Sequence, residues 1–132
     1  MRLSLALICA GALAAAAAVA QQQISPDDVL DRADQRTLTF ELFPYGGLVG
    51  VEQFLSRRRT VWATPTGTCT YGQIEIRGPQ LCFIYRDLAD PEHCWTPFDV
   101  DGVMVFVSSD FDRQQVTAIT TRPVVCEDAP LS

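Results

Sequence analysis

The sequence predicts a mainly β domain, an antiparallel meander that closes into a small lipocalin-like barrel or packs as a sandwich, preceded by one short N-terminal helix. Three observations lead to this fold class. Apolar runs with the two-residue period of strands recur from Leu38 to Thr120. Turn signals separate these runs at short, even spacing. After the start of the domain, no second helical pattern occurs.

The chain opens with a segment that has the features of a secretion signal. Arg2 is the only charged residue before Asp27. The stretch that follows Arg2 is apolar or small, and it ends in Ala18-Val19-Ala20, the small-x-small form that signal peptidases cleave. We therefore expect residues 1–20 to be a cleaved signal peptide and residues 21–132 to be a single disulfide-stapled β domain. The protein is then periplasmic or secreted, with no stable membrane anchor after cleavage.

A short helix is expected to open this domain. Ser25 suits the N-cap, Pro26 suits the first helical position, and Asp27-Asp28 place acids in the first turn. We expect the helix to end near Gln35. Its narrow apolar face consists of Val29, Leu30 and Ala33.

Strand-like runs follow the helix through the rest of the domain. Leu38, Phe40 and Leu42 alternate with polar residues, which is the pattern of a strand with one buried face. Glycine and proline turn signals separate the later runs, and Asp101-Gly102 is a tight hairpin signal. The expected strands cover residues 38–42, 48–55, 60–63, 69–76, 81–86, 94–98, 103–107 and 116–120.

Four cysteines lie after the expected cleavage site and allow three disulfide pairings. Cys82 and Cys94 lie on neighbouring expected strands, which favours a local disulfide between them. Cys69 would then pair with Cys126 and hold the C-terminal segment against the domain. The cysteines are spread, no Cys-x-x-Cys occurs, and the chain has a single histidine, so we expect no metal site and no cofactor.

The charge of the chain excludes one class of partner. Asp and Glu number 16 against 10 basic residues, all of them arginine, and the net charge is −6 at pH 7. Because the phosphates of nucleic acids repel such a chain, we expect no nucleic-acid partner. The sequence identifies no partner, and a small apolar ligand or an envelope protein fits the expected location.

Candidate functional residues each have a structural explanation that we favour. His93 has no signalled nucleophile or second histidine to complete a site, so we interpret it as a solvent-exposed loop residue before a disulfide. Asp99-x-Asp101-Gly102 has its glycine too early for an EF-hand and is interpreted as a hairpin turn. Arg57-Arg58-Arg59 is interpreted as a solvated loop or as protection of an edge strand, rather than as an anion-binding site.

Two larger groups of residues leave alternatives open. Five aromatic side chains either line an apolar ligand cavity or simply fill the core. The acidic side chains of the second half could supply the paired carboxylates of a glycosidase, but they fall mainly in expected turns, where charges serve solubility. The aromatic residues are Trp62, Phe83, Trp95, Phe98 and Phe106. The acidic residues are Asp87, Asp90, Glu92, Asp99, Asp101, Asp110 and Asp112.

Between Gly50 and Trp95 the chain joins a Cys-x-x-Gly segment, a Cys-Phe-x-Tyr segment and a Cys-Trp segment. In this pattern it resembles a group of small exported bacterial proteins of unknown function. The resemblance implies export and a similar fold, and it implies no activity. The matching residues are Gly50, Glu52, Phe54, Arg58, Arg59, Val61, Trp62, Cys69, Gly72, Leu81, Cys82, Phe83, Tyr85, Cys94 and Trp95.

No catalytic constellation stands out, so we expect a protein that is not an enzyme, with no catalytic residues and with ligand-binding residues unknown. A non-enzymatic binding or envelope accessory protein fits this expectation. One alternative is a lipocalin-like carrier of a small apolar ligand, and another is an inhibitor or interaction module for an envelope enzyme. A cavity of a few hundred cubic ångströms inside the barrel would favour the carrier, whereas a solid core with an ordered, protruding loop would favour the interaction module.

Overall fold

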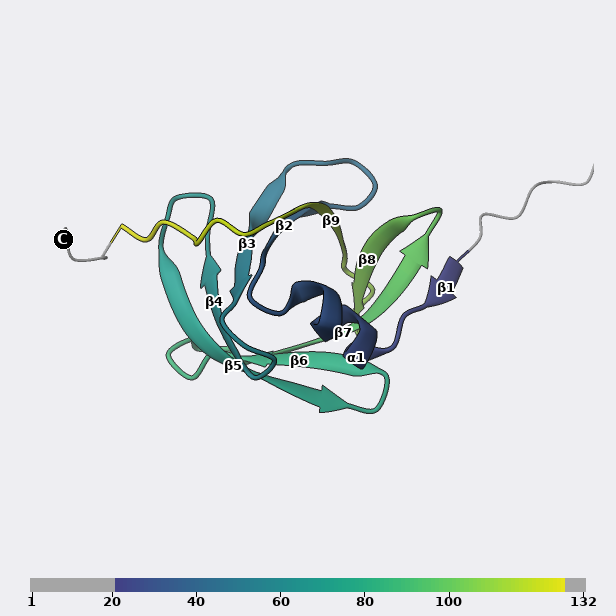
Figure 1. Ribbon diagram of the computed structural model, residues 1–132, viewed down its shortest axis with the longest axis horizontal. Coiled ribbons are helices and arrows are strands. Elements are labelled where there is room, and N and C mark those ends of the chain that lie inside the picture. Colours follow the sequence, from purple (N-terminus) through teal and green to yellow (C-terminus); the bar gives the residue numbers. More distant parts are fainter. Residues whose placement is uncertain (1–20, 128–132) are drawn as a thin grey trace, which may run out of the picture.

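Nine strands and one short helix make up residues 21–127, the part of the chain that this computed structural model describes (Figure 1). The expected signal peptide, residues 1–20, lies outside the described residues. The helix is α1 (Pro26–Ala33). The strands are β1 (Gln21–Gln23), β2 (Thr37–Leu42), β3 (Leu48–Phe54), β4 (Arg59–Ala63), β5 (Cys69–Arg77), β6 (Gln80–Ile84), β7 (Glu92–Val100), β8 (Val103–Ser108) and β9 (Arg113–Thr120).

Eight of these strands form a closed antiparallel barrel, which confirms the expected fold class. Each strand from β2 to β8 pairs with the next one along the chain, and β9 pairs back with β2 to complete the ring. The register of β2 shifts beside Phe40 against both of its neighbours. Such bulges bend a strand and increase its twist, which helps a sheet to close on itself. The meander therefore forms a barrel and not a sandwich.

Helix α1 closes one end of the barrel, where Figure 1 shows it lying across the ring of strands. Ser25 caps it as expected, because its Oγ accepts a hydrogen bond from the Asp28 backbone N–H at 3.1 Å. The helix ends at Ala33, slightly before the expected end near Gln35. Gln35 has a left-handed φ of 56°, which an α-helix cannot continue.

The apolar face of α1 packs into the core, and its polar face is tied to the β3–β4 turn. Val29, Leu30 and Ala33 are buried in one cluster with side chains from the strands. On the outside, the Arg57 guanidinium in the β3–β4 turn contacts both Asp27, at 2.7 Å, and Asp31. Because the barrel is a meander, the loops that precede β3, β5, β7 and β9 all lie at the opposite end.

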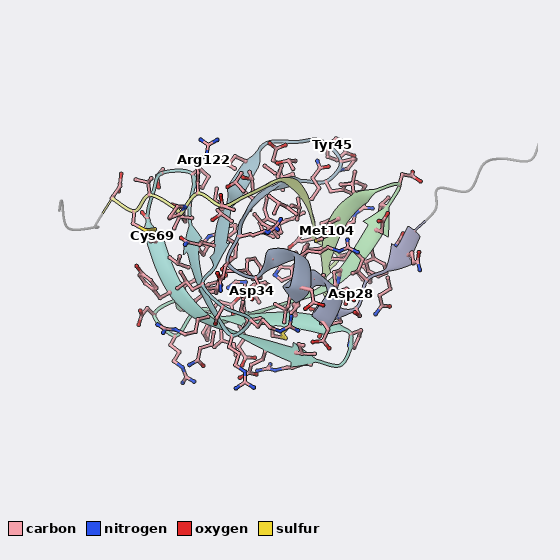
Figure 2. All side chains as sticks on the ribbon, viewed as in Figure 1. Asp28, Asp34, Tyr45, Cys69, Met104 and Arg122 are labelled. Carbon is pink, nitrogen blue, oxygen red and sulfur yellow. A yellow bond between two sulfur atoms is a disulfide. The ribbon has the colours of Figure 1, made fainter. Side chains whose placement is uncertain are left out.

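Both expected disulfides are present. Cys82 and Cys94 are directly opposite residues of β6 and β7. Cys69 pairs with Cys126, and the segment after β9 (yellow in Figure 1) runs past β3 and β4 toward Cys69, which Figure 2 labels. The Val124 backbone N–H donates to the Gln53 side chain at 3.1 Å on the way. The C-terminal segment is therefore fastened along the outside of the barrel.

Three strands differ most from the expected ranges. β1 was missed because Gln21–Gln23 is polar and exposed, yet it pairs with the last residues of β7. β7 extends to Val100, where it pairs with β1 and with β8, and β9 already begins at Arg113. Within residues 21–127, no helix has the length and apolar character needed to cross a membrane.

Candidate ligand cavity

A cavity of about 240 Å³ lies in the barrel at the end opposite α1. It lies next to the buried core, and several aromatic side chains of the core also line the cavity. Leu88, in the loop between β6 and β7, is 40% exposed and lies at the border between cavity and solvent. The side chains that line the cavity are Phe40, Glu52, Trp62, Phe83, Tyr85, Leu88, His93, Trp95, Phe106 and Gln114.

Aromatic rings form most of the cavity wall. Phe40 contacts Phe106 edge-on, with ring centroids 5.2 Å apart, and Trp62 at 6.2 Å. These distances fall in the range of favourable aromatic pairs. Trp62, Phe83, Trp95 and Phe106, four of the five aromatic residues that the sequence suggested, line the cavity. The fifth, Phe98, is half-buried in β7 and is not part of the lining.

Two glycines make room for the largest rings of the site. A Cβ atom on Gly50 would lie 2.2 Å from Cζ2 of Trp62, and one on Gly72 would lie 2.6 Å from Cδ1 of Tyr85. Real Cβ atoms do not approach other atoms so closely. Glycine is therefore required at both positions if the Trp62 and Tyr85 rings are to lie flat against the barrel wall.

One carboxyl group, that of Glu52, is buried in this aromatic environment. Its side chain is 3% exposed. The Tyr85 hydroxyl donates to Oε2 at 2.7 Å, and the Thr60 hydroxyl donates to Oε1. Thr60 Oγ also lies 3.0 Å from the Gln53 carbonyl oxygen. Glu52 on β3 is thus held by Thr60 on β4 and by Tyr85, which directly follows β6.

Burial controls the charge of this group. Removal from water raises the pKa of Glu52 from its ordinary value of 4.5 to about 7, although the hydrogen bonds from Thr60 and Tyr85 oppose the rise. Burial, together with the nearby Glu52 charge, also raises the pKa of the Tyr85 phenol, which therefore stays protonated and remains a donor. Near neutral pH the cavity can consequently hold either a carboxylate or a carboxylic acid.

The structure corrects the expected position of His93. It lies in strand β7, where it is half-buried and lines the cavity, and it is not an exposed loop residue. The expectation was wrong because β7 starts at Glu92, before the disulfide, so the alternation that points Cys94 outward points His93 inward. The His93 Nε2 atom lies 2.9 Å from the Asp90 carbonyl oxygen, and the ring lies 5.9 Å from that of Tyr85.

The other candidate residues lie outside the cavity. Gly102 donates its backbone N–H to Asp99 Oδ1 at 2.8 Å in the turn between β7 and β8, so this motif is the expected hairpin. Glu92 forms an ion pair with Arg77 across the outer surface at 3.1 Å. Arg58 and Arg59 are exposed, and Arg57 is half-buried. In residues 21–127, no three His, Cys, Asp or Glu side chains gather in a way that could hold a metal ion.

Sequence reasoning missed Glu52, although a signal for it was present. Gly50, Glu52 and Phe54 alternate with half-buried residues along β3, and Phe54 is fully buried. A charged residue on the same face as a core phenylalanine is a buried charge, which is rare without a functional or structural reason. This two-residue alternation in the sequence is enough to mark Glu52 as a candidate site residue.

Comparison of the chain with protein-family models, curated proteins and solved structures finds no match.

Proposed function

We propose that the protein is a non-enzymatic binding protein that holds one small, largely apolar ligand in the open end of its barrel. The observation that supports this proposal is the aromatic cavity of about 240 Å³ above the core. A cavity of about 150 Å³ in another protein is large enough to bind benzene. The volume therefore suits a ligand of one ring with short substituents.

The cavity favours the carrier over the interaction module. An eight-stranded barrel can be filled by its own side chains, in which case no ligand fits. Here a buried core packs against α1, and a cavity of about 240 Å³ remains beside that core at the other end of the barrel. The proposal includes export, because two disulfides suit a protein of an oxidising compartment, the periplasm or the medium.

Native mass spectrometry of protein isolated from its own cells tests the proposal. A retained mass of a small organic molecule would support it. Binding can then be followed by fluorescence, because the two tryptophans of the chain, Trp62 and Trp95, both line the cavity. A ligand in the cavity should change their emission.

A matched pair of variants distinguishes the cavity from the outer surface. Gln114→Phe adds bulk to a residue that lines the cavity. It should weaken binding by about tenfold or more, because the larger side chain occupies volume that the ligand needs. Gln115→Phe changes the neighbouring residue, whose side chain donates to the Leu42 carbonyl and is not part of the lining. Equal affinities of the two variants would place the ligand elsewhere and overturn the proposal.

A further inference from the structure

The buried carboxyl group of Glu52 has no arginine or lysine partner in the cavity. The described ion pairs of residues 21–127 do not include it, and no arginine lines the cavity. The chain contains no lysine. A buried carboxylate without an opposite charge is unfavourable, so the cavity has an electrostatic position that suits a positive group.

The rest of the lining is suited to the same kind of group. Positive nitrogen is attracted to the faces of aromatic rings, most of all to tryptophan. Trp62 and Trp95 both line the cavity, and Trp62 is directly opposite Glu52 in the pairing of β3 with β4. An anion would instead meet the Glu52 carboxylate and the negative faces of these rings.

The hydrogen bonds around Glu52 allow it to exist with or without its proton. Thr60 has one hydroxyl proton and two acceptors within reach, Glu52 Oε1 and the Gln53 carbonyl oxygen. When Glu52 is ionised, Thr60 donates to Oε1. When Glu52 is protonated, it donates to Thr60 Oγ, and Thr60 donates to Gln53. Tyr85 donates to Oε2 in both arrangements, so neither form leaves a buried group without a partner.

From this geometry we propose that the cavity selects small organic cations. The charged nitrogen, of an amine or a quaternary ammonium, takes the position opposite Glu52, and the apolar body lies against the aromatic walls. This inference rests on the proposed function, to which it adds the class of ligand. When the cation binds to protein in which Glu52 is protonated, the proton leaves to solvent, so binding of one positive charge releases one proton.

The experiment compares two probes of the same shape. Benzyltrimethylammonium carries a permanent positive charge, and neopentylbenzene is its uncharged carbon analogue. Binding of each to the oxidised protein is measured at pH 8 by tryptophan fluorescence. We expect the cation to bind about tenfold more tightly than the analogue or better, because it gains the carboxylate and the ring faces. Equal affinities, or tighter binding of the analogue, would overturn the cation selectivity and leave the proposed function standing. Binding of neither probe would overturn both.

Two substitutions assign the selectivity to Glu52. Glu52→Gln keeps the shape and removes the charge, and it should weaken binding of the cation by about tenfold while the analogue changes less than about threefold. Glu75→Gln removes the same charge from the outer surface, where Glu75 pairs with Arg77, and should leave both affinities unchanged. If Glu75→Gln weakened cation binding to the same extent, the effect would come from the net charge of the protein, and the assignment of the selectivity to Glu52 would be overturned.

Proton release provides a second readout. The titratable groups that line the cavity are Glu52 on β3, Tyr85 directly after β6 and His93 on β7, and the lining residues of β2, β4, β8 and β9 carry no charge. Calorimetry at pH 6 in two buffers of different ionisation enthalpy should show proton release on cation binding, about half a proton per cation for a tenfold preference for ionised Glu52. Because histidines change charge in this pH range, the measurement is repeated with His93→Gln. Proton release that persists there supports Glu52, and release that disappears assigns it to His93 and overturns the inference.

Discussion

Tyr85 donates a 2.7 Å hydrogen bond to Glu52 across the barrel interior, from the end of β6 to β3, although two strands separate them in the sheet. The bond joins two polar groups of an otherwise largely aromatic cavity. Gly72 permits it, because a side chain there would occupy the place of the Tyr85 ring. The stability of the barrel and the charge of its cavity are therefore connected through one carboxyl group.

Stability should depend on pH through Glu52. Its pKa is about 7 in the folded protein and near 4.5 in the unfolded chain, so the folded state binds more protons between these values and the folded protein loses stability as the pH rises through them. The loss is about 3 kcal/mol. Glu52→Gln has no ionisable group at this position and should not show this pH-dependent loss of stability. Urea unfolding should be measured for both proteins at pH 4.5 and pH 8. Relative to the unaltered protein, the unfolding free energy of Glu52→Gln should be about 3 kcal/mol more favourable at pH 8 than at pH 4.5. A difference that is constant with pH would contradict the raised pKa.

Tyr85→Phe should destabilise the protein more at pH 8 than at pH 5. The phenol hydrogen bond lowers the pKa of Glu52, so its removal raises that pKa further and makes the ionised form more costly. We expect a loss of about 1 kcal/mol at pH 5, where the carboxyl is largely neutral, and about 2 kcal/mol at pH 8. The measurement is urea unfolding at both pH values. An equal loss at both would indicate that the ring packs but its hydroxyl does not interact with the charge.

Gly50→Ala should move Trp62. The new methyl group would overlap the indole, which must rotate away from the wall or push β3 and β4 apart, at a cost of about 1–3 kcal/mol. Tryptophan emission should shift as the ring leaves its place. Trp62→Leu in the same chain should recover part of the lost stability, because the smaller side chain frees the space. Purely additive losses in the double variant would show that the two residues do not interact.

The two disulfides should contribute unequally. Cys69–Cys126 closes a sequence separation of 57 residues and Cys82–Cys94 one of 12. In the chain-entropy account these loops correspond to about 4 and about 3 kcal/mol. Replacing each pair by alanines and measuring urea unfolding should reproduce that order, with peptide mapping to verify the remaining disulfide. A smaller loss for the Cys69–Cys126 pair would show that the C-terminal segment stays in place without it.

The fold could be predicted largely from local pattern, because strands, turns and the N-cap of α1 depend on residues close in sequence. The alternation around Phe40 and the Asp101-Gly102 turn are of this kind. β1 escaped prediction because three exposed glutamines have no alternation, and only pairing with β7 makes them a strand.

The site was harder to predict, because it depends on which interior positions share one end of the barrel. The aromatic residues were recognisable as core or cavity, but only closure of the ring decides between them. The contact between Tyr85 and Glu52 spans 33 residues and requires three intervening strand pairings. His93 was assigned to a loop because β7 begins at Glu92, before the expected start at Cys94, and only the pairing with β6 reveals this extension.

Helix α1 blocks one end of the barrel, so a ligand of the proposed kind would enter and leave the cavity by one route, at the other end, where Leu88 lies. Microscopic reversibility then couples the two rates. A change in the β6–β7 loop that leaves the occupied state untouched must accelerate uptake and escape by the same factor and cannot alter the equilibrium. In the carrier that we propose, a loop variant that takes up its ligand faster must therefore also release it faster, unless the cavity itself changes between uptake and release.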